Sequence, residues 1–228
     1  MIDRKRYLLD GMAQLVSADY VAWVLAAATD PGKKPVYVGF ETRGISAEQM
    51  PKFLRIQAHP ALAEYSQPLL VELSATGQQV TANVQDIFDY AEFESSEWGK
   101  MWADADIAPR CIIHRPLANG GVSGIGCYRR LGRPLFTECE RLIVHLLLTE
   151  IPWLHEMGWP GDLGAKVPDL PPQGWLVHEM LLQGFDRSRI AAELGISRHT
   201  SDSYVKQVFR HLGVQSQPEL MARFFLGG

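Results

Sequence analysis

The chain lacks a long apolar run and a secretion signal. No stretch approaches the roughly 20 apolar residues that cross a bilayer. The N-terminal segment is basic and then apolar, but Asp10 interrupts it and no small-residue cleavage site follows. We therefore expect a cytoplasmic protein that has no membrane partner.

Cysteines are few. Cys111, Cys127 and Cys139 lie 16 and 12 residues apart, which is neither a disulfide framework nor the spacing of a metal site. The sequence predicts buried free thiols and no bound metal.

Motifs for catalysis are also missing. The run GGVSGIG resembles a phosphate-cradling loop but lacks a following helix or lysine, and there is no nucleophile elbow or zinc motif. Asp104 and Asp106 are better explained as a turn at the end of a helix than as a carboxylate pair. We expect no catalytic residue and no cofactor.

A basic excess is missing as well. The 228 residues carry a net charge of −4, so there is no overall attraction to nucleic acid. From Leu170 to the end, six basic residues face five acidic ones, a net charge of +1, and the remainder carries −5. Because phosphate neutralisation supplies much of the affinity for DNA, a DNA-binding segment is usually more basic.

The most informative stretch is residues 185–214, which reads as a helix, a tight turn and a second helix. Gly195 ends the first helix, Ser197 is placed to cap the second, and Gly213 ends that one. Apolar residues at helical spacing mark the inner faces: Ile190, Ala191, Leu194, Val205, Val208, Phe209 and Leu212. Any two packed helices give such a face, but the agreement of cap, turn and apolar spacing favours a helix-turn-helix, whose second helix can lie in the DNA major groove.

The preceding part alternates helices and strands. We expect a helix over 2–17, strands over 19–28 and 35–42 around a turn at 30–33, and a helix from Ser46 past Ile56, with a further helical turn at 61–65. A short strand at 79–82, a helix or loop at 84–90, and a helix capped by Ser95 or Ser96 follow. Strands over 109–117 and 122–130 then precede a helix over 136–155, begun by a Thr137–Glu140 capping box, whose apolar face holds Leu142, Ile143, Leu146, Leu147 and Ile151.

Glycine and proline then interrupt all periodicity, which indicates a linker. The expected domains are residues 1–157, a linker over 158–170, and residues 171–228. The last part holds four helices, near 172–183, on either side of Gly195, and over 220–226. The predicted class is α+β, an α/β/α domain with a mostly antiparallel sheet followed by an all-α helix-turn-helix domain.

The C-terminal part resembles the LuxR-type (GerE-type) DNA-binding domain. The matching stretches are Gly184, IAAELGIS over 190–197, His199-Thr200 and LGVQS over 212–216, at the family's spacing without a gap. The resemblance implies that the second helix enters the major groove of double-stranded DNA and that the last helix helps two copies to pair. The residues that it would place against DNA are Arg198, Thr200, Ser203, Lys206, Gln207 and Arg210, which in the alternative interpretation belong to a solvated helix face.

Two departures from the family bear on that function. The family commonly has valine and lysine directly after the threonine, and this chain has Ser201-Asp202; the family's opening arginine-glutamate pair is Gln173-Gly174 here. A carboxylate repels phosphates, although Asp202 could accept a hydrogen bond from a cytosine amine. DNA binding could thus be weak, specific to an unusual site, or lost.

The N-terminal part resembles GAF-like sensory domains. The resemblance rests on GIGCYRRLGRPLFTECERLIVHLLLTEIPWL, a strand ending in arginine, a short polar loop, a phenylalanine and a long helix. The spaced tryptophan–tyrosine–aspartate pattern of acyl-homoserine-lactone sensors is not found in register. A sheet covered by helices can hold a small molecule, and the candidate lining, unless these are plain core aromatics, is Trp23, Tyr37, Phe53, Tyr65, Phe93, Trp98 and Trp102.

The sequence thus predicts a transcriptional regulator with a sensor domain coupled to a C-terminal helix-turn-helix. It would act as a homodimer on DNA, with an unidentified small-molecule ligand in the N-terminal domain. The alternative is a sensory or protein-interaction module whose helix-turn-helix has weakened or lost DNA binding and which pairs with another regulator. In a third interpretation the first domain binds no ligand and only dimerises.

Overall fold

The computed structural model describes residues 2–27, 36–46, 48–108, 110–118, 120–156, 172–182 and 184–222. The chain divides into two compact units, Met1–Met157 and Gly158–Gly228. The expected turn at 30–33 and the expected linker at 158–170 lie outside the described residues.

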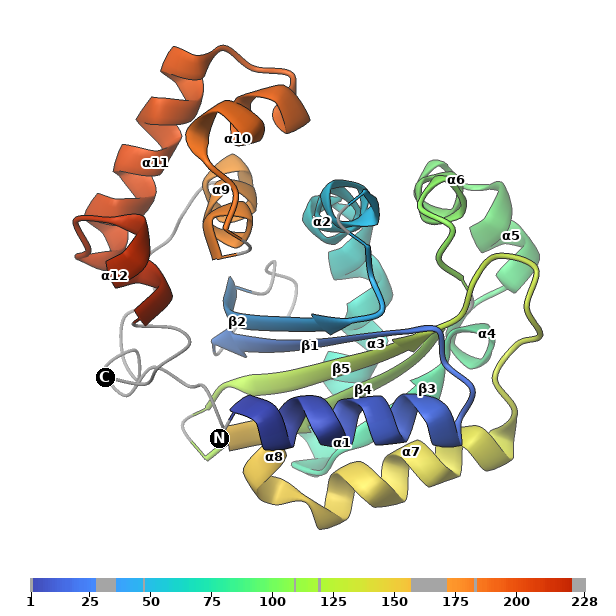
Figure 1. Ribbon diagram of the computed structural model, residues 1–228. Helices are drawn as coiled ribbons and strands as arrows, with labels where there is room; N and C mark the ends of the chain where they lie inside the picture. The colour runs from blue at the N-terminus through green and yellow to red at the C-terminus, as the bar shows by residue number, and fades with distance from the viewer. Residues whose placement is uncertain are drawn as a thin grey trace. The chain divides into compact units, whose positions relative to one another are not determined.

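The first unit is built on a five-stranded sheet in which each neighbouring pair of strands is antiparallel, in the order β2-β1-β5-β4-β3 (Figure 1). Its strands are β1 (Tyr20–Ala27), β2 (Val36–Arg43), β3 (Val80–Asn83), β4 (Arg110–Pro116) and β5 (Val122–Tyr128). The α+β class and the antiparallel sheet are as predicted.

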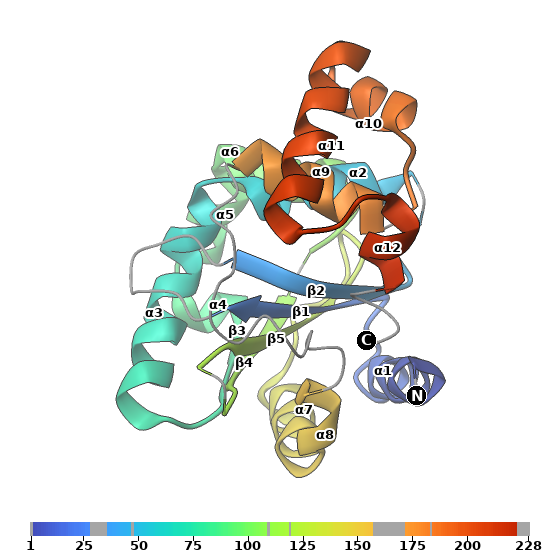
Figure 2. The ribbon, with the colours of Figure 1, turned by 90° about the vertical axis from the view of Figure 1, so that its left-hand side faces the viewer.

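Helices cover both faces of the sheet (Figures 1 and 2). On one face lie α1 (Ile2–Leu15), α7 (Glu138–Glu150) and α8 (Pro152–Glu156); Asp10 of α1 accepts from Arg43 of β2, and His155 of α8 bonds Ser123 of β5. On the other face lie α2 (Gln49–Ala58), α3 (Ala61–Thr76) and α6 (Glu97–Asp104). The short helices α4 (Val84–Ile87) and α5 (Tyr90–Ser95) connect β3 to α6.

Several predicted caps form. Ser46 and Gln49 exchange backbone-to-side-chain hydrogen bonds at the entrance to α2, Ser96 caps α6 through Gly99 N, and Thr137 and Glu140 make the reciprocal capping box of α7. The caps at Ser96 and at Thr137–Glu140 therefore fix where α6 and α7 begin, whereas α2 begins at Gln49, after Glu48, whose side chain makes no capping hydrogen bond.

Two helices differ from expectation. The helical turn expected at 61–65 is the start of α3, which continues through Pro68 to Thr76 and ends where Gly77 adopts a left-handed conformation. The single helix expected over 136–155 breaks after Glu150, because Pro152 has no N–H to donate and disfavours a helical conformation at Ile151, which adopts φ −119° and ψ 65°.

The predicted apolar face of α7 is also wrong. The fully buried residues of this helix are Val144 and Leu148, whereas the side chains of Leu142 and Leu146 are 44% and 60% exposed. Cys139, at the start of α7, is exposed too, so that only Cys111 and Cys127 are the buried free thiols that the sequence predicts.

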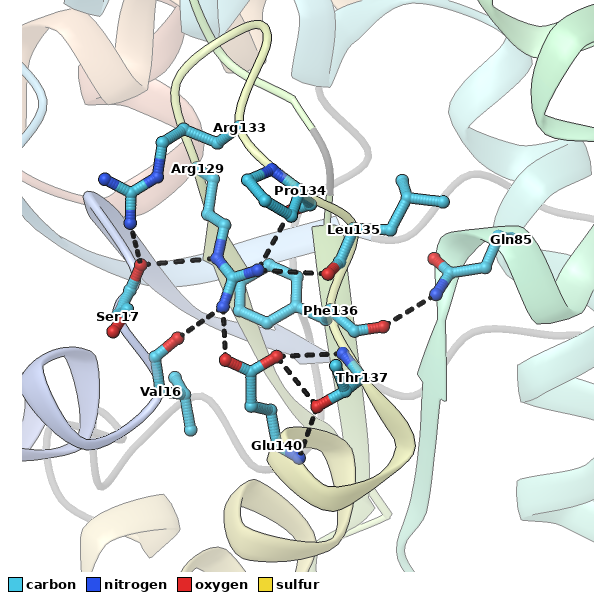
Figure 3. Close-up of polar contacts among 10 residues, drawn as sticks. All are labelled: Val16, Ser17, Gln85, Arg129, Arg133, Pro134, Leu135, Phe136, Thr137 and Glu140. Atoms are coloured by element: carbon cyan, nitrogen blue, oxygen red, sulfur yellow. Dashed lines mark hydrogen bonds and ion pairs between the residues drawn. The ribbon is translucent and has the colours of Figure 1, made fainter.

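Arg129, the residue that follows β5, ties three segments together (Figure 3). Its guanidinium donates to the carbonyl of Val16 after α1, to the carbonyls of Pro134 and Leu135, and to Glu140 in α7. It also lies over the ring of Phe136, with Cζ 4.0 Å from the centroid. These contacts give a physical reason for the arginine, loop and phenylalanine in the stretch over 124–154, because acceptors around a buried cation offset the cost of removing it from water.

The second unit is all-helical in its described part, with α9 (Pro172–Leu182), α10 (Arg187–Leu194), α11 (Arg198–Leu212) and α12 (Gln217–Met221). Helix α11 packs against α9 and α10, and Gln217 at the start of α12 donates to the carbonyls of Leu181 and Phe185. The expected extension of the last helix to residue 226 falls outside the described residues beyond 222.

Candidate functional site

The turn between α10 and α11 is set by local backbone chemistry. Asp186 caps α10 by accepting from Arg189 N at 2.8 Å. Gly195 has φ +63°, its N–H donates to the carbonyl of Ala192, and the N–H of Ile196 donates to that of Ala191, which is the Schellman pattern. Ser197 then accepts from Thr200 N at 3.1 Å and starts α11. The sequence predicted both the glycine and the serine cap.

The buried face of α11 holds the four predicted apolar residues, Val205, Val208, Phe209 and Leu212, together with Ser201. The hydroxyl of Ser201 donates to the carbonyl of Arg187 at 3.0 Å, which fastens the start of α11 to the start of α10. The family's valine at this position is thus replaced by a buried polar residue that has a partner.

Five of the six residues predicted to face DNA share one side of α11. At about 100° per residue, they lie within an arc of about 120° opposite the buried face: Thr200, Ser203, Lys206, Gln207 and Arg210. Ser203, Lys206 and Arg210 are exposed, and Thr200 and Gln207 are half-buried. Arg198 is exposed but lies at about 80° or more from that arc, on the same edge of the helix as Asp202.

Asp202 is directed toward α10. Its Oδ1 accepts from Arg187 Nη1 at 3.3 Å, and its side chain is 33% exposed. The carboxylate that appears from the sequence to oppose DNA phosphates is therefore paired with a cation of the same motif, and the arc of α11 carries Lys206 and Arg210 without an acidic residue. Sequence spacing along one helix cannot reveal a partner that lies on another helix.

The first unit contains a cavity of about 70 Å³ between the sheet and helices α2, α3 and α6. Of the seven predicted aromatic residues, Phe53 and Trp102 line it. Tyr65, Phe93 and Trp98 belong to the aromatic cluster beside it, in which Tyr65 and Trp98 have ring centroids 4.5 Å apart and Trp98 and Trp102 5.7 Å apart. The side chain of Tyr37 lies outside the described part of the chain.

Trp23 lies on the opposite face of the sheet. Its Nε1 donates to Ser123 Oγ at 3.0 Å, and the same hydroxyl bonds Nδ1 of His155 in α8 at 2.9 Å. Trp23 therefore belongs to the layer of α1 and α8 and is separated from the other predicted residues by the sheet. Its neighbours Ala22 and Val24 face the cavity instead.

Arg110, at the start of β4, is the lining residue that the sequence did not suggest. It is 3% exposed, and its Cζ lies 5.0, 4.6 and 4.4 Å from the ring centroids of Phe93, Trp98 and Trp102. Burial lowers its pKa to about 10, so the guanidinium still carries its charge near neutral pH. Among the described residues, no group accepts a hydrogen bond from its Nε or Nη2.

The balance of energies at Arg110 is unusual. A cation–π contact contributes about 0.5–2 kcal/mol, whereas a buried ion without a counter-charge costs several kcal/mol even after relaxation. The aromatic rings thus offset part of the cost of burying the charge. Nε and Nη2 still lack an acceptor among the described residues.

Two further polar groups on the cavity are also unpaired within the described part of the chain. These are Nε1 of Trp102 and Nδ1 of His114, and burial lowers the pKa of His114 to about 4, so its imidazole is neutral near pH 7.

Gly124 and Gly126 of β5 line the cavity on the side of the sheet. A Cβ at Gly126 would come within 2.1 Å of the Tyr128 hydroxyl, so only glycine leaves room for that ring to lie across the strand.

Comparison with known proteins identifies the second unit. The family described as "Bacterial regulatory proteins, luxR family" matches residues 169–224. No curated protein matches the chain. In the described part of the chain, no helix combines the length and the apolar character that a membrane span requires.

Solved structures resemble the chain at low identity. Escherichia coli SdiA is 14% identical, with 98% of this chain and 89% of that chain covered and a TM-score of 0.40. The VqsR LBD domain from Pseudomonas aeruginosa is 17% identical over 67% of this chain and 82% of that one, with a TM-score of 0.43. A GAF domain/HD domain protein from Geobacter sulfurreducens is 15% identical over 68% and 89%, with a TM-score of 0.38.

Proposed function

Residues 169–224 form a LuxR-type helix-turn-helix domain, and we propose on this basis that the chain is a cytoplasmic transcriptional regulator that binds double-stranded DNA as a homodimer. In this proposal residues 1–157 sense a small molecule and dimerise, residues 158–170 are a linker, and residues 171–228 bind DNA. The ligand changes how the two DNA-binding domains are presented to two half-sites.

The observation that carries the proposal is the outward arc of α11. Lys206 and Arg210 are exposed there, about 40° apart around the helix, and Gln207 lies about 60° beyond Arg210 on the same arc. With this arc in the major groove, Arg210 and Lys206 bind phosphates or guanine edges and Gln207 reaches an adenine edge. Arg198, on the edge of the helix, contacts the phosphate backbone.

Binding of the full chain to DNA from upstream of its own reading frame tests this proposal. Fluorescence anisotropy at several salt concentrations gives the slope of log affinity against log salt, which changes by about 0.9 for each phosphate contact. Lys206→Ala and Arg210→Ala should each reduce the slope by about 1 if they contact phosphate. Arg130→Ala, which removes an exposed arginine of the first unit, is the matched control and should leave the slope unchanged.

If the chain shows no salt-sensitive binding either to that DNA or to a randomised duplex library, the proposal is wrong. If Arg130→Ala reduces the slope as much as Lys206→Ala does, DNA binding is a general effect of charge rather than a property of α11.

Exposed apolar residues on α7 and α8 support the homodimer. Leu142 and Leu146 lie one turn apart on α7, and Trp153 of α8 is 41% exposed. Apolar groups at this spacing are typical of an interface, and the two-fold sites read by helix-turn-helix proteins favour a second copy as the occupant. Sedimentation equilibrium of the full chain should show a dimer that Leu146→Glu weakens, whereas Leu15→Glu, at an equally exposed site of α1, does not.

The alternative is that the helix-turn-helix has weakened or lost DNA binding and the chain pairs with another regulator. The nearly neutral charge of the second unit and the acidic residue at position 202 favour it. The pairing of Asp202 with Arg187 speaks for DNA binding, because it offsets that acidic charge. The anisotropy experiment discriminates directly, since the alternative predicts no salt-dependent affinity.

A further inference from the structure

We propose that the cavity of the first unit binds a small organic carboxylate, whose carboxylate group pairs with the buried guanidinium of Arg110. This inference rests on the proposed sensor function of that unit and names the chemical class of its ligand. It also assigns a negative charge to the ligand, because the aromatic rings around Arg110 carry none.

The first observation is a buried cation without a counter-ion. Arg110 lines the cavity, and in the described part of the chain no Asp or Glu forms an ion pair with it. The neighbouring groups whose charges affect it are the phenols of Tyr128, Tyr65 and Tyr90. Since a buried charge needs a partner, a bound anion supplies what the protein leaves out.

The second observation is which donors are free. Nε and Nη2 form the side-by-side edge of a guanidinium, which matches the two oxygens of a carboxylate. Two arginines of the described chain use this edge in that way. Arg43 Nε and Nη2 donate to the two carboxylate oxygens of Asp10, both at 2.7 Å, and the same atoms of Arg141 donate to Glu138 at 2.7 and 2.6 Å. On Arg110 the same two atoms have no acceptor among the residues that the structure describes.

Arg129 shows that the fold can fully satisfy a buried arginine. It is as buried as Arg110, at 4% against 3% exposed, yet its nitrogens donate to four backbone carbonyls and to Glu140. The unpaired edge of Arg110 is therefore a local feature of the cavity and not a general property of buried cations in this protein.

The rest of the cavity fits a carboxylate that carries a short carbon chain. Trp102 Nε1 and neutral His114 offer further hydrogen bonds, and the apolar walls are formed by side chains such as Phe53, Leu62, Leu70 and Ile112. Arg110 is the single Lys or Arg among the described lining residues, which suits one negative charge rather than the two of a phosphate. About 70 Å³ holds several waters or a few heavy atoms, so the ligand is compact.

Isothermal titration of the full chain with sodium butyrate, at constant ionic strength in sodium chloride, tests this inference. Butyramide has nearly the same shape without the charge. We expect saturable binding of butyrate, quenching of tryptophan fluorescence because Trp98 and Trp102 surround Arg110, and at least tenfold weaker binding of butyramide. Equal binding of the two compounds overturns the inference, as does binding of inorganic phosphate in preference to butyrate.

Arg110→Met, which removes the charge but fills the aromatic cage, should weaken butyrate binding at least tenfold. Arg43→Met is the control, because it removes an equivalent guanidinium edge on the other face of the sheet and should leave butyrate affinity unchanged. If Arg110→Met does not fold, Arg110→Lys keeps a cation and lacks the two-donor edge, and the same tenfold loss is expected. Unchanged butyrate affinity in a folded Arg110 variant contradicts the inference.

The titration is done without DNA, so its result is independent of the helix-turn-helix. A chain that binds DNA with normal salt dependence but prefers butyramide or binds neither compound retains the proposed function and loses the carboxylate assignment. A chain that binds butyrate through Arg110 but no duplex retains the carboxylate site and loses the regulatory proposal.

Discussion

Arg187 and Asp202 form an ion pair between the first and second helices of the helix-turn-helix, with Nη1 and Oδ1 3.3 Å apart. The two side chains are 45% and 33% exposed, so the pair contributes at most about 1 kcal/mol to stability. Its main effect is on the charge that α11 presents, because it turns the acidic side chain toward α10 and leaves the outward arc basic.

This geometry predicts that position 202 is a poor site for adding DNA affinity. Asp202→Lys should steepen the slope of log affinity against log salt by less than Ser203→Lys, which places the same new cation on the outward arc. Ser203→Lys should add up to about 0.9 to the slope. Fluorescence anisotropy with a non-specific duplex measures both variants. A larger effect of Asp202→Lys would mean that residue 202 faces phosphate and that the pairing with Arg187 is lost on DNA.

The second prediction concerns the Arg129–Glu140 contact. Burial raises the pKa of Glu140, but hydrogen bonds from the backbone and hydroxyl of Thr137 and from Arg129 outweigh it, and the net pKa is below its ordinary value. Glu140→Gln should cost about 2–3 kcal/mol of unfolding free energy, because it leaves a buried guanidinium without its anion. Urea unfolding followed by tryptophan fluorescence measures the loss.

Since the folded-state pKa of Glu140 is lowered, its stabilisation is complete above the unfolded pKa of about 4.3 and disappears as the pH falls through the folded value. The stability difference between the wild type and Glu140→Gln should therefore shrink below about pH 4. Glu138→Gln is the control: it also removes a partner of an arginine, but on the surface, and it should change stability much less. A difference that is constant down to pH 2 would contradict the role given to the Glu140 charge.

Caps and turns are local, so Ser96, Thr137, Gly195 and Ser197 could be assigned from their neighbours in the chain. The face on which Trp23 lies could not be, because helices cover both sides of the sheet and both sides of β1 are therefore apolar.

Arg110 illustrates the same limit more strongly. An arginine at the first position of a strand is typical of an exposed strand end, and nothing in PRCIIHRPL indicates burial. Its environment is made by Phe93, Trp98 and Trp102 of two helices that precede it by 8 to 17 residues and fold back over the strand. The buried face of α7 cannot be predicted from the sequence for a related reason, since an exposed Leu142 or Leu146 has the same helical spacing as a buried one.

The third prediction is that acid lowers the stability of the fold already at pH values above those at which carboxylates titrate. Burial lowers the pKa of His114 and of His155 to about 4 in the folded chain, against about 6.5 when unfolded. Between these values the unfolded state binds more protons, so stability should fall as the pH drops from 6.5 to 4, by about 1.4 kcal/mol per pH unit for each histidine. His155→Asn should remove part of this slope, as measured by urea unfolding at a series of pH values. An unchanged slope in His155→Asn would show that its imidazole is not buried and neutral.

The last prediction compares Gly195, which has a left-handed backbone in the turn of the helix-turn-helix, with Gly11, which lies inside a helix. Gly195 has φ +63°, and a Cβ added there would meet no atom within 4 Å, so the cost of Gly195→Ala is that of the left-handed backbone alone, about 1 kcal/mol or somewhat more. Gly11 lies inside α1 and likewise has nothing within 4 Å of an added Cβ, so that Gly11→Ala should stabilise the chain by up to about 1 kcal/mol.

Identical substitutions at two uncrowded sites should therefore change stability in opposite directions, as measured by hydrogen exchange of α10 and α11 for one variant and of α1 for the other. Gly195→Ala should also weaken DNA binding more than its stability loss explains, because relieving the strain at residue 195 rotates α11 relative to α10. If Gly195→Ala is as stable as the wild type and binds DNA equally well, the left-handed turn does not set the position of the recognition helix.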